Sequence, residues 1–321
     1  MILSSAISSA AARGEIFSRA DSPLLNRVIG GTYPPGSTFK IVSSLAALSS
    51  GKVNENTIFQ DNGVIYLGQY KFTNWYFNQY GRTEGSVNLV KALQRSNDTY
   101  YYEISRLIGE KQIADWAKKL RLGGKLEIDL PGEETGLIPD NDWKQKTYGQ
   151  IWYPGDTLHM SIGQGFVLTT PLQVLGITSY IAANGTLYKP QLLLDSKPKV
   201  LASNLLPKEK IKVIAEGLKL VPKEGGTAWT FLTFPLQTAG KTGTAEYGDP
   251  KGKTHAWYTS FAPVDDPRLS LTVLIEGGGE GSSVAAPIAK EAFRYYFSPD
   301  KNKLIQDLYT QATESGRSLG E

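Results

Sequence analysis

The chain has 321 residues, and its 34 Lys and Arg against 31 Asp and Glu leave a net charge of only +3. Such a mild balance argues against nucleic acid or an anionic membrane as the main partner, because those partners are bound through strongly basic surfaces. The chain contains no cysteine, and its two histidines, His159 and His255, show no metal-ligand spacing. We therefore expect no disulfide, no metal and no cofactor.

The opening segment, MILSSAISSAAAR, has no basic leading part, and serines interrupt its apolar stretch. This pattern is not that of a signal peptide. No run of the chain approaches the ~20 apolar residues that a membrane-spanning helix needs.

The first landmark is the turn Tyr33-Pro34-Pro35-Gly36, followed by a helix that opens at Ser37 and ends near Ser50-Gly51. Short aromatic-rich strands or loops are expected over 52–81, and two helical pieces between 86 and 122. Frequent Pro and Gly over 123–155 predict a surface loop. A helix should follow Thr170-Pro171, and an amphipathic helix should cover 208–221.

The pattern changes to strands at 238–246, 255–264 and 268–276, joined by short turn-rich segments. Short connections between consecutive strands predict an antiparallel sheet, and residues 284–297 predict a closing helix on it. The fold class is therefore α+β. We expect one domain over 1–321, with a mostly helical subdomain at about 52–235. The sheet-forming part takes about 1–51 and 236–297, and 298–321 is a polar tail.

Ser37 and Lys40 form an S-x-x-K pair on the predicted helix, where residues three apart share a face. Serine is a poor nucleophile without a neighbouring base, and lysine serves as that base when burial lowers its pKa. The alternative is that Ser37 only caps the helix. Three other S-x-x-K matches begin at Ser49, Ser196 and Ser298, but only Ser37 follows a rigid turn and opens an apolar helix.

Lys241-Thr242-Gly243-Thr244 is the only K-[ST]-G sequence in the chain and lies on a predicted strand. The glycine allows a close approach of another backbone, as an extended peptide would make when it pairs with the strand. The threonine hydroxyls and the lysine suit a substrate carboxylate. An exposed strand with a glycine bulge is the structural alternative for this segment.

Ser96-Asn97-Asp98 lies between two helical stretches, a junction that can direct a hydroxyl and a short polar side chain into a cleft. Ser86-Val87-Asn88 has the same pattern, but it begins a helix and is better explained as a cap.

The motifs PPGSTFK, SND and KTGTAE, in that order, resemble the three-motif set of penicillin-binding proteins and serine β-lactamases. Ser96 follows Ser37 by 59 positions, and Lys241 follows Ser96 by 145. Longer segments are similar to the elongation-type class B penicillin-binding proteins, the penicillin-binding protein 2 group: PLLNRVIGGTYPPGSTFKIV, GDTLHMSIGQGFVLTTPLQV and THAWYTSFAPVDDPRLSLTVLIEGGGEGSSVAAPIA. The resemblance runs from about residue 23 to 297.

This resemblance implies the fold of the penicillin-recognising serine transpeptidases and β-lactamases, an antiparallel sheet flanked by helices beside a mostly helical subdomain. It also implies a peptidoglycan D,D-transpeptidase, an enzyme that cross-links stem peptides through an acyl-enzyme and is acylated by β-lactams. The implied catalytic residues are Ser37 as nucleophile, Lys40 as base, and Ser96 and Lys241 as proton relays.

The resemblance further implies that Asp98, Thr242, Gly243 and Thr244 bind the substrate, and that the backbone N–H groups of Ser37 and Thr244 form an oxyanion hole. The family often has Asn where this chain has Asp98, and a carboxylate can only accept hydrogen bonds.

The expected partners are stem peptides, β-lactams and a membrane glycan-polymerising protein, with no nucleic acid. By resemblance the location is the outer face of the cytoplasmic membrane, although the pedestal domain and membrane anchor of the family are absent from the sequence. The chain starts late in the family's first region, so we expect a truncated form whose sheet has an unpaired edge. A serine β-lactamase, a β-lactam or peptide sensor, and an inactive truncated homologue remain alternatives.

Overall fold

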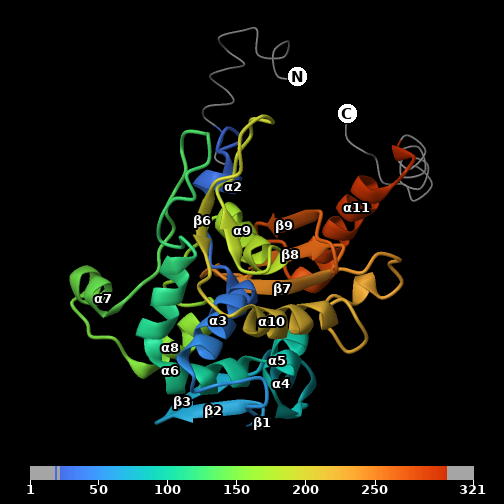
Figure 1. Cartoon of the computed structure of the whole chain (residues 1–321). Helices are drawn as coiled ribbons and strands as arrows, with labels where there is room; N and C mark the ends of the chain where they lie inside the picture. Colours follow the sequence, from blue (N-terminus) through green and yellow to red (C-terminus); the bar gives the residue numbers. More distant parts are fainter. Residues whose placement is uncertain (1–18, 20–21, 302–321) are drawn as a thin grey trace.

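The strands expected near the C-terminus form one antiparallel sheet in the order β7 (Ala239–Glu246), β8 (Thr254–Ala262), β9 (Leu269–Ile275). A computed structural model describes residue 19 and residues 22–301 of the chain (Figure 1). The expectations for residues 1–18 and for the tail beyond 301 lie outside the described residues. Among those described, β9 pairs only with β8, so it forms one edge of the sheet.

Successive residues of β8 point to opposite faces of the sheet and join different parts of the core. Ala256, Tyr258 and Ala262 pack with one set of apolar residues, whereas Trp257 packs against Val174 on the other face. Strand residues alternate in this way because the side-chain period of a strand is two. The register pairs every residue from Ala239–Phe261 to Glu246–Thr254 across β7 and β8.

Two helices cover the two faces of this sheet (Figure 1). The closing helix α11 (Ala286–Phe297) packs Ala289 and Phe293 into the cluster that contains Tyr258. On the other face lies α9 (Pro171–Ala182), whose Thr178 hydroxyl is 2.5 Å from that of Thr259 in β8. The predicted closing helix and the predicted helix after Thr170-Pro171 are both confirmed.

The helix α3 (Lys40–Ser50) runs through the centre of the molecule, where its residues from 40 to 48 are all buried. It continues a 3₁₀ turn, η1 (Gly36–Phe39), and ends at Gly51, whose φ of 73° suits a left-handed C-cap. The main core cluster surrounds it, with residues from α5 (Leu89–Arg95), α6 (Asp98–Lys119) and α10 (Lys208–Leu220).

The remaining elements are short. They are α2 (Arg27–Gly30), β1 (Phe59–Asp61), β2 (Val64–Leu67), β3 (Tyr70–Thr73), α4 (Trp75–Tyr80), β4 (Gly85–Val87), α7 (Asn141–Tyr148), α8 (Pro154–Ser161), β5 (Thr186–Tyr188), β6 (Val200–Ser203), η2 (Trp229–Phe231) and the π-helical turn η3 (Gly281–Ala285). In the described part of the chain, no helix is long and apolar enough to cross a membrane.

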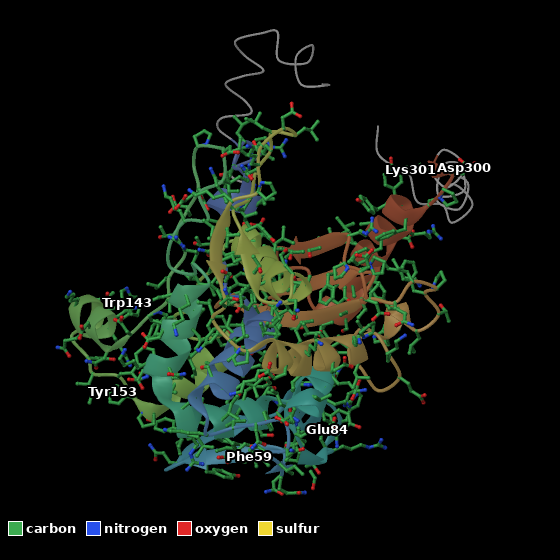
Figure 2. The ribbon with its side chains drawn as sticks, in the orientation of Figure 1. Phe59, Glu84, Trp143, Tyr153, Asp300 and Lys301 are labelled. Carbon is green, nitrogen blue, oxygen red and sulfur yellow. The ribbon has the colours of Figure 1, made fainter. Side chains whose placement is uncertain are left out.

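The prediction of a surface loop over 123–155 was wrong for 141–148 and for the residues from 154 on, where α7 and the start of α8 fall. The sequence of α7 is polar, so hydrophobic periodicity gave no sign of a helix. Its ends are set by capping: the Asp140 side chain accepts from Trp143 N, and Gly149 closes the helix. Figure 2 shows Trp143 and Tyr153 on this projecting arm.

Two further expectations need correction. Residues 75–80, expected as strand or loop, form the helix α4. This helix was not predicted, because four of its six side chains are aromatic and no helical periodicity marks it. Ser86 and Val87, expected to begin a helix, belong to β4, and only Asn88 caps α5 by accepting from Lys91 N.

Candidate active site

Ser37 lies on the tight turn between the Pro-Pro-Gly segment and α3. It is the second residue of η1, and its carbonyl accepts the backbone N–H of Lys40. Side chains three residues apart eclipse each other in a 3₁₀ helix, so Ser37 and Lys40 lie one above the other. The backbone thus brings Ser37 and Lys40 to neighbouring positions on one helical turn, and contact between their side chains stays a prediction.

The turn that carries Ser37 is held between neighbouring elements. The carbonyl of Pro34 accepts a hydrogen bond from the indole Nε1 of Trp257 at 3.0 Å, and Gly36 N donates to Gly163 O at 3.0 Å. Gly36 has φ of 52°, and a Cβ there would lie 2.9 Å from the carbonyl oxygen of Thr244. Glycine is therefore required by both the backbone angle and the space.

Gly243 of β7 faces the same turn. A Cβ at Gly243 would meet Thr38 Cγ2 at 3.1 Å and Pro35 O at 3.2 Å. The sequence suggested that this glycine admits a substrate backbone. The structure shows that it already lets strand β7 approach the turn of Ser37.

Lys40 is completely buried. Its Nζ donates to Ser96 O at 2.7 Å, to Ser96 Oγ at 3.2 Å and to Asp98 Oδ1 at 2.6 Å. Burial lowers the pKa of Lys40, whereas the charge of Asp98 and its hydrogen bond raise it. The net direction is downward, which favours a neutral amine at a lower pH than an exposed lysine would allow.

Ser96 adopts a left-handed conformation, with φ of 52°, as the C-cap of α5. Serine in this region costs about 1–2 kcal/mol relative to a right-handed conformation. The strained backbone turns both its carbonyl and its hydroxyl toward Lys40. Strain of this kind gathers at functional sites, where the surrounding structure holds it in place.

Lys241 of β7 is the second completely buried lysine, and its Nζ donates to Thr242 O at 3.0 Å. Burial holds the pKa of Lys241 well below its ordinary value, the positive charge of Lys40 lowers it further, and Asp98 opposes both. The two lysines therefore disfavour each other's protonation.

Thr242 and Thr244 lie two residues apart on β7, and both reach the cleft described below. The Thr242 hydroxyl is 2.6 Å from the hydroxyl of Thr227, a residue of the loop between α10 and β7. Thr244 is exposed, and its Oγ1 accepts from Gly281 N at 3.4 Å. Two hydroxyls are thus presented beside Gly243.

A cleft of about 1150 Å³ opens over these groups. Six of the eight predicted site residues line it: Ser37, Ser96, Asp98, Thr242, Gly243 and Thr244. Lys40 and Lys241 are completely buried behind its wall. The structure therefore brings all eight together from η1, the start of α3, the α5–α6 junction and β7. The alternative S-x-x-K serines, Ser49, Ser196 and Ser298, do not line it.

An aromatic wall from β3 and α4 closes one side of the cleft, with Tyr70, Phe72, Trp75, Tyr76 and Tyr80. Sequence reasoning did not identify this wall, because short aromatic-rich segments carry no motif. It also did not identify Thr227, which lies outside the three motifs.

Within the described ranges, no group of three or more His, Asp or Glu residues could hold a metal ion.

Both histidines have packing roles that the structure makes visible. His255 Nδ1 accepts from Gly277 N at 3.1 Å, and its ring stacks on Tyr247 with centroids 4.0 Å apart. His159 lines the cleft and packs against Phe72 at 5.2 Å. Burial lowers the pKa of each histidine.

Comparison with known protein families matches residues 5–294 to the penicillin binding protein transpeptidase domain. Peptidoglycan D,D-transpeptidase MrdA of Haemophilus influenzae is 33% identical over 303 residues, which cover 86% of this chain and 46% of that protein. The chain spans about half the length of the curated relatives it matches.

Solved structures of penicillin-binding protein 2 are also similar. The crystal structure of the Pseudomonas aeruginosa protein in complex with WCK 5153 matches with a TM-score of 0.82 and 34% identity, covering 92% of this chain and 67% of that one. A chain from a study of structural coordination of polymerization and crosslinking by a peptidoglycan synthase complex gives a TM-score of 0.83 and 33% identity, covering 92% and 51%. These matches confirm the expected fold.

Proposed function

The chain belongs to the penicillin-binding protein transpeptidase family, of the penicillin-binding protein 2 group, and we propose that it is a serine-type D,D-transpeptidase that cross-links peptidoglycan stem peptides. One observation carries the proposal. Ser37, Ser96 and the Thr242–Thr244 segment reach one cleft from three separate parts of the chain, with two completely buried lysines behind them.

In the proposed acylation, the Ser37 hydroxyl oxygen attacks the carbonyl carbon of the penultimate D-Ala of a stem peptide. The Lys40 amine takes the serine proton, as its lowered pKa allows. The ester bond to Ser37 forms and the peptide C–N bond breaks. A proton passes to the leaving amino group of the terminal D-Ala through Ser96, whose Oγ lies 3.2 Å from Lys40 Nζ.

Lys241 supports this relay from the side of β7, where burial and the charge of Lys40 favour its neutral amine. In the second half-reaction, an amine of a neighbouring stem peptide attacks the acyl carbon. The Ser37–acyl bond then breaks, the amine proton returns to Ser37 by the same route, and the cross-link is complete.

The backbone N–H groups of Ser37 and Thr244 are proposed as the oxyanion hole. Ser37 is the second residue of η1, and the first N–H groups of a helix have no acceptor within it. A donor aimed at the developing oxyanion contributes about 3–4 kcal/mol to the transition state. The hydroxyls of Thr242 and Thr244 would hold the substrate carboxylate, and Gly243 keeps the strand close to Ser37.

Asp98 reaches both Lys40 and the cleft. We propose that it contacts the substrate amide while it sets the position of the lysine amine. As a carboxylate it accepts a hydrogen bond, and the amide N–H of the substrate is the matching donor.

Acylation by a fluorescent penicillin tests the assignment of Ser37 and Lys40. We expect covalent labelling of the wild type, no labelling of Ser37→Ala, and at least ~100-fold slower labelling of Lys40→Ala, the lower range for loss of a positioned base. Intact mass after penicillin exposure gives the stoichiometry. Unchanged labelling of Ser37→Ala would refute the nucleophile, and unchanged rates in Lys40→Ala would refute the base.

The lifetime of the adduct separates the transpeptidase from the alternative β-lactamase. A transpeptidase excludes efficient attack by water, so we expect the penicillin adduct to last for hours. Release within seconds would favour a hydrolase.

We further propose that the domain acts on the extracytoplasmic side of the membrane and works beside a glycan-polymerising protein. The support is its similarity to MrdA proteins and to a chain from a peptidoglycan synthase complex. Co-purification of this chain with such a polymerase, from membranes of the source organism, tests the partnership.

A further inference from the structure

Asp61 is a buried carboxylate that the proposed mechanism does not use. It is the last residue of β1, and only 2% of its surface is exposed. Its two oxygens accept five hydrogen bonds: from Gly63 N at 2.8 Å and Thr99 Oγ1 at 2.8 Å on Oδ1, and from Asn74 Nδ2 at 3.0 Å, Glu84 N at 2.9 Å and Asn97 Nδ2 at 2.9 Å on Oδ2.

Buried carboxylates are usually paired with a cation. Among the described residues Asp61 forms no ion pair, and neutral donors surround it instead. A carboxylate only accepts hydrogen bonds, so a single group can satisfy all five donors. An amide of the same shape would turn an N–H₂ group against some of them. The donor set therefore requires an acidic residue at this position.

Asn74 connects this carboxylate to the catalytic cleft. It is completely buried, and while its Nδ2 donates to Asp61, its Oδ1 accepts the backbone N–H of Asp98 at 3.1 Å. The next backbone N–H, of Trp75, donates to Asp98 Oδ2 at 2.9 Å. The other oxygen of Asp98 receives Lys40 Nζ at 2.6 Å. The hydrogen bonds thus run without a break from Asp61 to Lys40, with the backbone N–H of Asp98 as one link.

A second connection runs through Asn97. Its Nδ2 donates to Asp61, and its Oδ1 accepts Tyr100 N as the N-cap of α6. Asp61 is thus connected to the second motif twice, directly to Asn97 and through Asn74 to Asp98.

We propose that Asp61 is a positioning residue that, through Asn74 and Asn97, fixes the orientation of Asp98 and thereby the position of the Lys40 amine. This inference rests on the proposed function, because it assigns to Lys40 the role of base. Asp61 also connects the aromatic wall to Lys40. It lies at the end of β1 and accepts Glu84 N, and the segment that carries the wall lies between these two positions in the chain. Figure 2 shows Phe59 and Glu84 at the same end of the molecule.

The positioning role has a pH signature that a purely structural role lacks. Among the described residues, Lys40 Nζ faces Asp98 and the Tyr101 ring on α6 and the charge of Lys241 on β7. Asp98 raises the pKa of Lys40, so a displaced Asp98 leaves that pKa lower. The neutral amine is then available at lower pH, even as misalignment slows the reaction.

The test is the pH dependence of penicillin acylation in Asp61→Asn. We expect at least a ~10-fold lower maximal rate, because small displacements of catalytic groups cost up to about 100-fold. We expect the acidic limb of the pH–rate profile, where Lys40 becomes protonated, to move to lower pH by about half a unit. This is part of the shift that a nearby opposite charge causes in a pKa. The matched control is Glu133→Gln, at a 7% exposed carboxylate that accepts Leu126 N and Ile128 N outside the cleft. It should keep the wild-type limb.

A wild-type limb in Asp61→Asn overturns the inference, whether or not the rate falls. If that variant does not fold, Asn74→Ala removes the bridge and leaves Asp61 its four other donors, and the same shift is expected. An unmoved limb in Asn74→Ala, or failure of both variants to fold, also overturns it. Absence of acylation in the wild type would instead refute the proposed function, and the inference with it.

Discussion

Lys40 and Asp98 form an ion pair, with Nζ 2.6 Å from Oδ1, in which the lysine side chain is fully buried and the aspartate side chain is 11% exposed. Burial and pairing act on the lysine in opposite directions, and burial is the larger effect. Asp98 thus opposes the formation of the neutral amine that the proposed reaction needs, while it holds that amine beside Ser96.

We predict that Asp98→Asn moves the acidic limb of the acylation profile to lower pH. Asp98 raises the pKa of Lys40, so its neutralisation lowers that pKa, by roughly one unit for an opposite charge at this distance. Rates of acylation by a chromogenic β-lactam between pH 5 and about 9 give the profile. A limb that moves to higher pH would contradict the assignment of Lys40 as base.

We predict that Lys241→Met stabilises the protein near neutral pH. Burial lowers the pKa of Lys241 well below 10.5, so between the folded and unfolded pKa values the unfolded chain binds a proton here that the folded protein does not. Stability therefore rises with pH from the lowered pKa up to that of the unfolded chain. Melting temperatures should be a few degrees above wild type at about pH 7, and the difference should shrink toward about pH 10.

The control for this stability measurement is Lys212→Met, on the exposed face of α10. It should change the melting temperature little at any pH, because exposed substitutions have small effects. A constant difference between Lys241→Met and wild type across the pH range would show that protonation of Lys241 is not linked to folding.

We predict that Gly243→Ala slows acylation by at least ~10-fold and destabilises the fold by about 1–3 kcal/mol, the usual cost of overpacking. The added methyl would lie 3.0 Å from Trp257 Cβ and 3.1 Å from Thr38 Cγ2, so β7 must move away from the turn of Ser37. Gly124→Ala is the control, since its nearest neighbour would be 3.7 Å away. Full acylation by Gly243→Ala would mean that the close approach is not needed.

We predict that Thr227→Val weakens β-lactam binding several-fold and leaves the limiting acylation rate nearly unchanged. The Thr227 hydroxyl is 2.6 Å from that of Thr242, which it orients toward the proposed carboxylate position. Loss of one neutral hydrogen bond costs about 1 kcal/mol. Acylation rates over a range of antibiotic concentrations separate binding from chemistry, with the exposed Thr135→Val as control. An effect confined to the limiting rate would contradict this role.

Local patterns predicted the sheet and several helices. The strand-length segments of β7, β8 and β9, the turns between them and the caps at Gly51 and Thr170 depend on neighbouring residues, so local patterns were enough to predict them. The helices α4 and α7 were not predicted, because neither has an apolar stripe. Asp98 caps α4 from a distant segment, and no local pattern reports such a contact.

The three motifs and their order let the sequence indicate the eight candidate residues, although their chemical roles stay predictions. The division into a helical subdomain at about 52–235 and a sheet-forming part likewise stays a prediction. What the sequence could not provide was the environment of each residue. Nothing local in S-x-x-K or K-T-G says that both lysines are fully buried, that Ser96 has a positive φ, or that Asp61 holds the second motif.

For this protein, the sequence by itself determined which groups are available: a serine with a lysine three residues on, a second serine, and a strand with Thr, Gly and Thr. Only the tertiary structure decided their state. The pKa of Lys40 depends on burial and on Asp98, which is 58 positions away in the chain. Desolvation and charge act through space, so their effects appear only when the chain has folded around them.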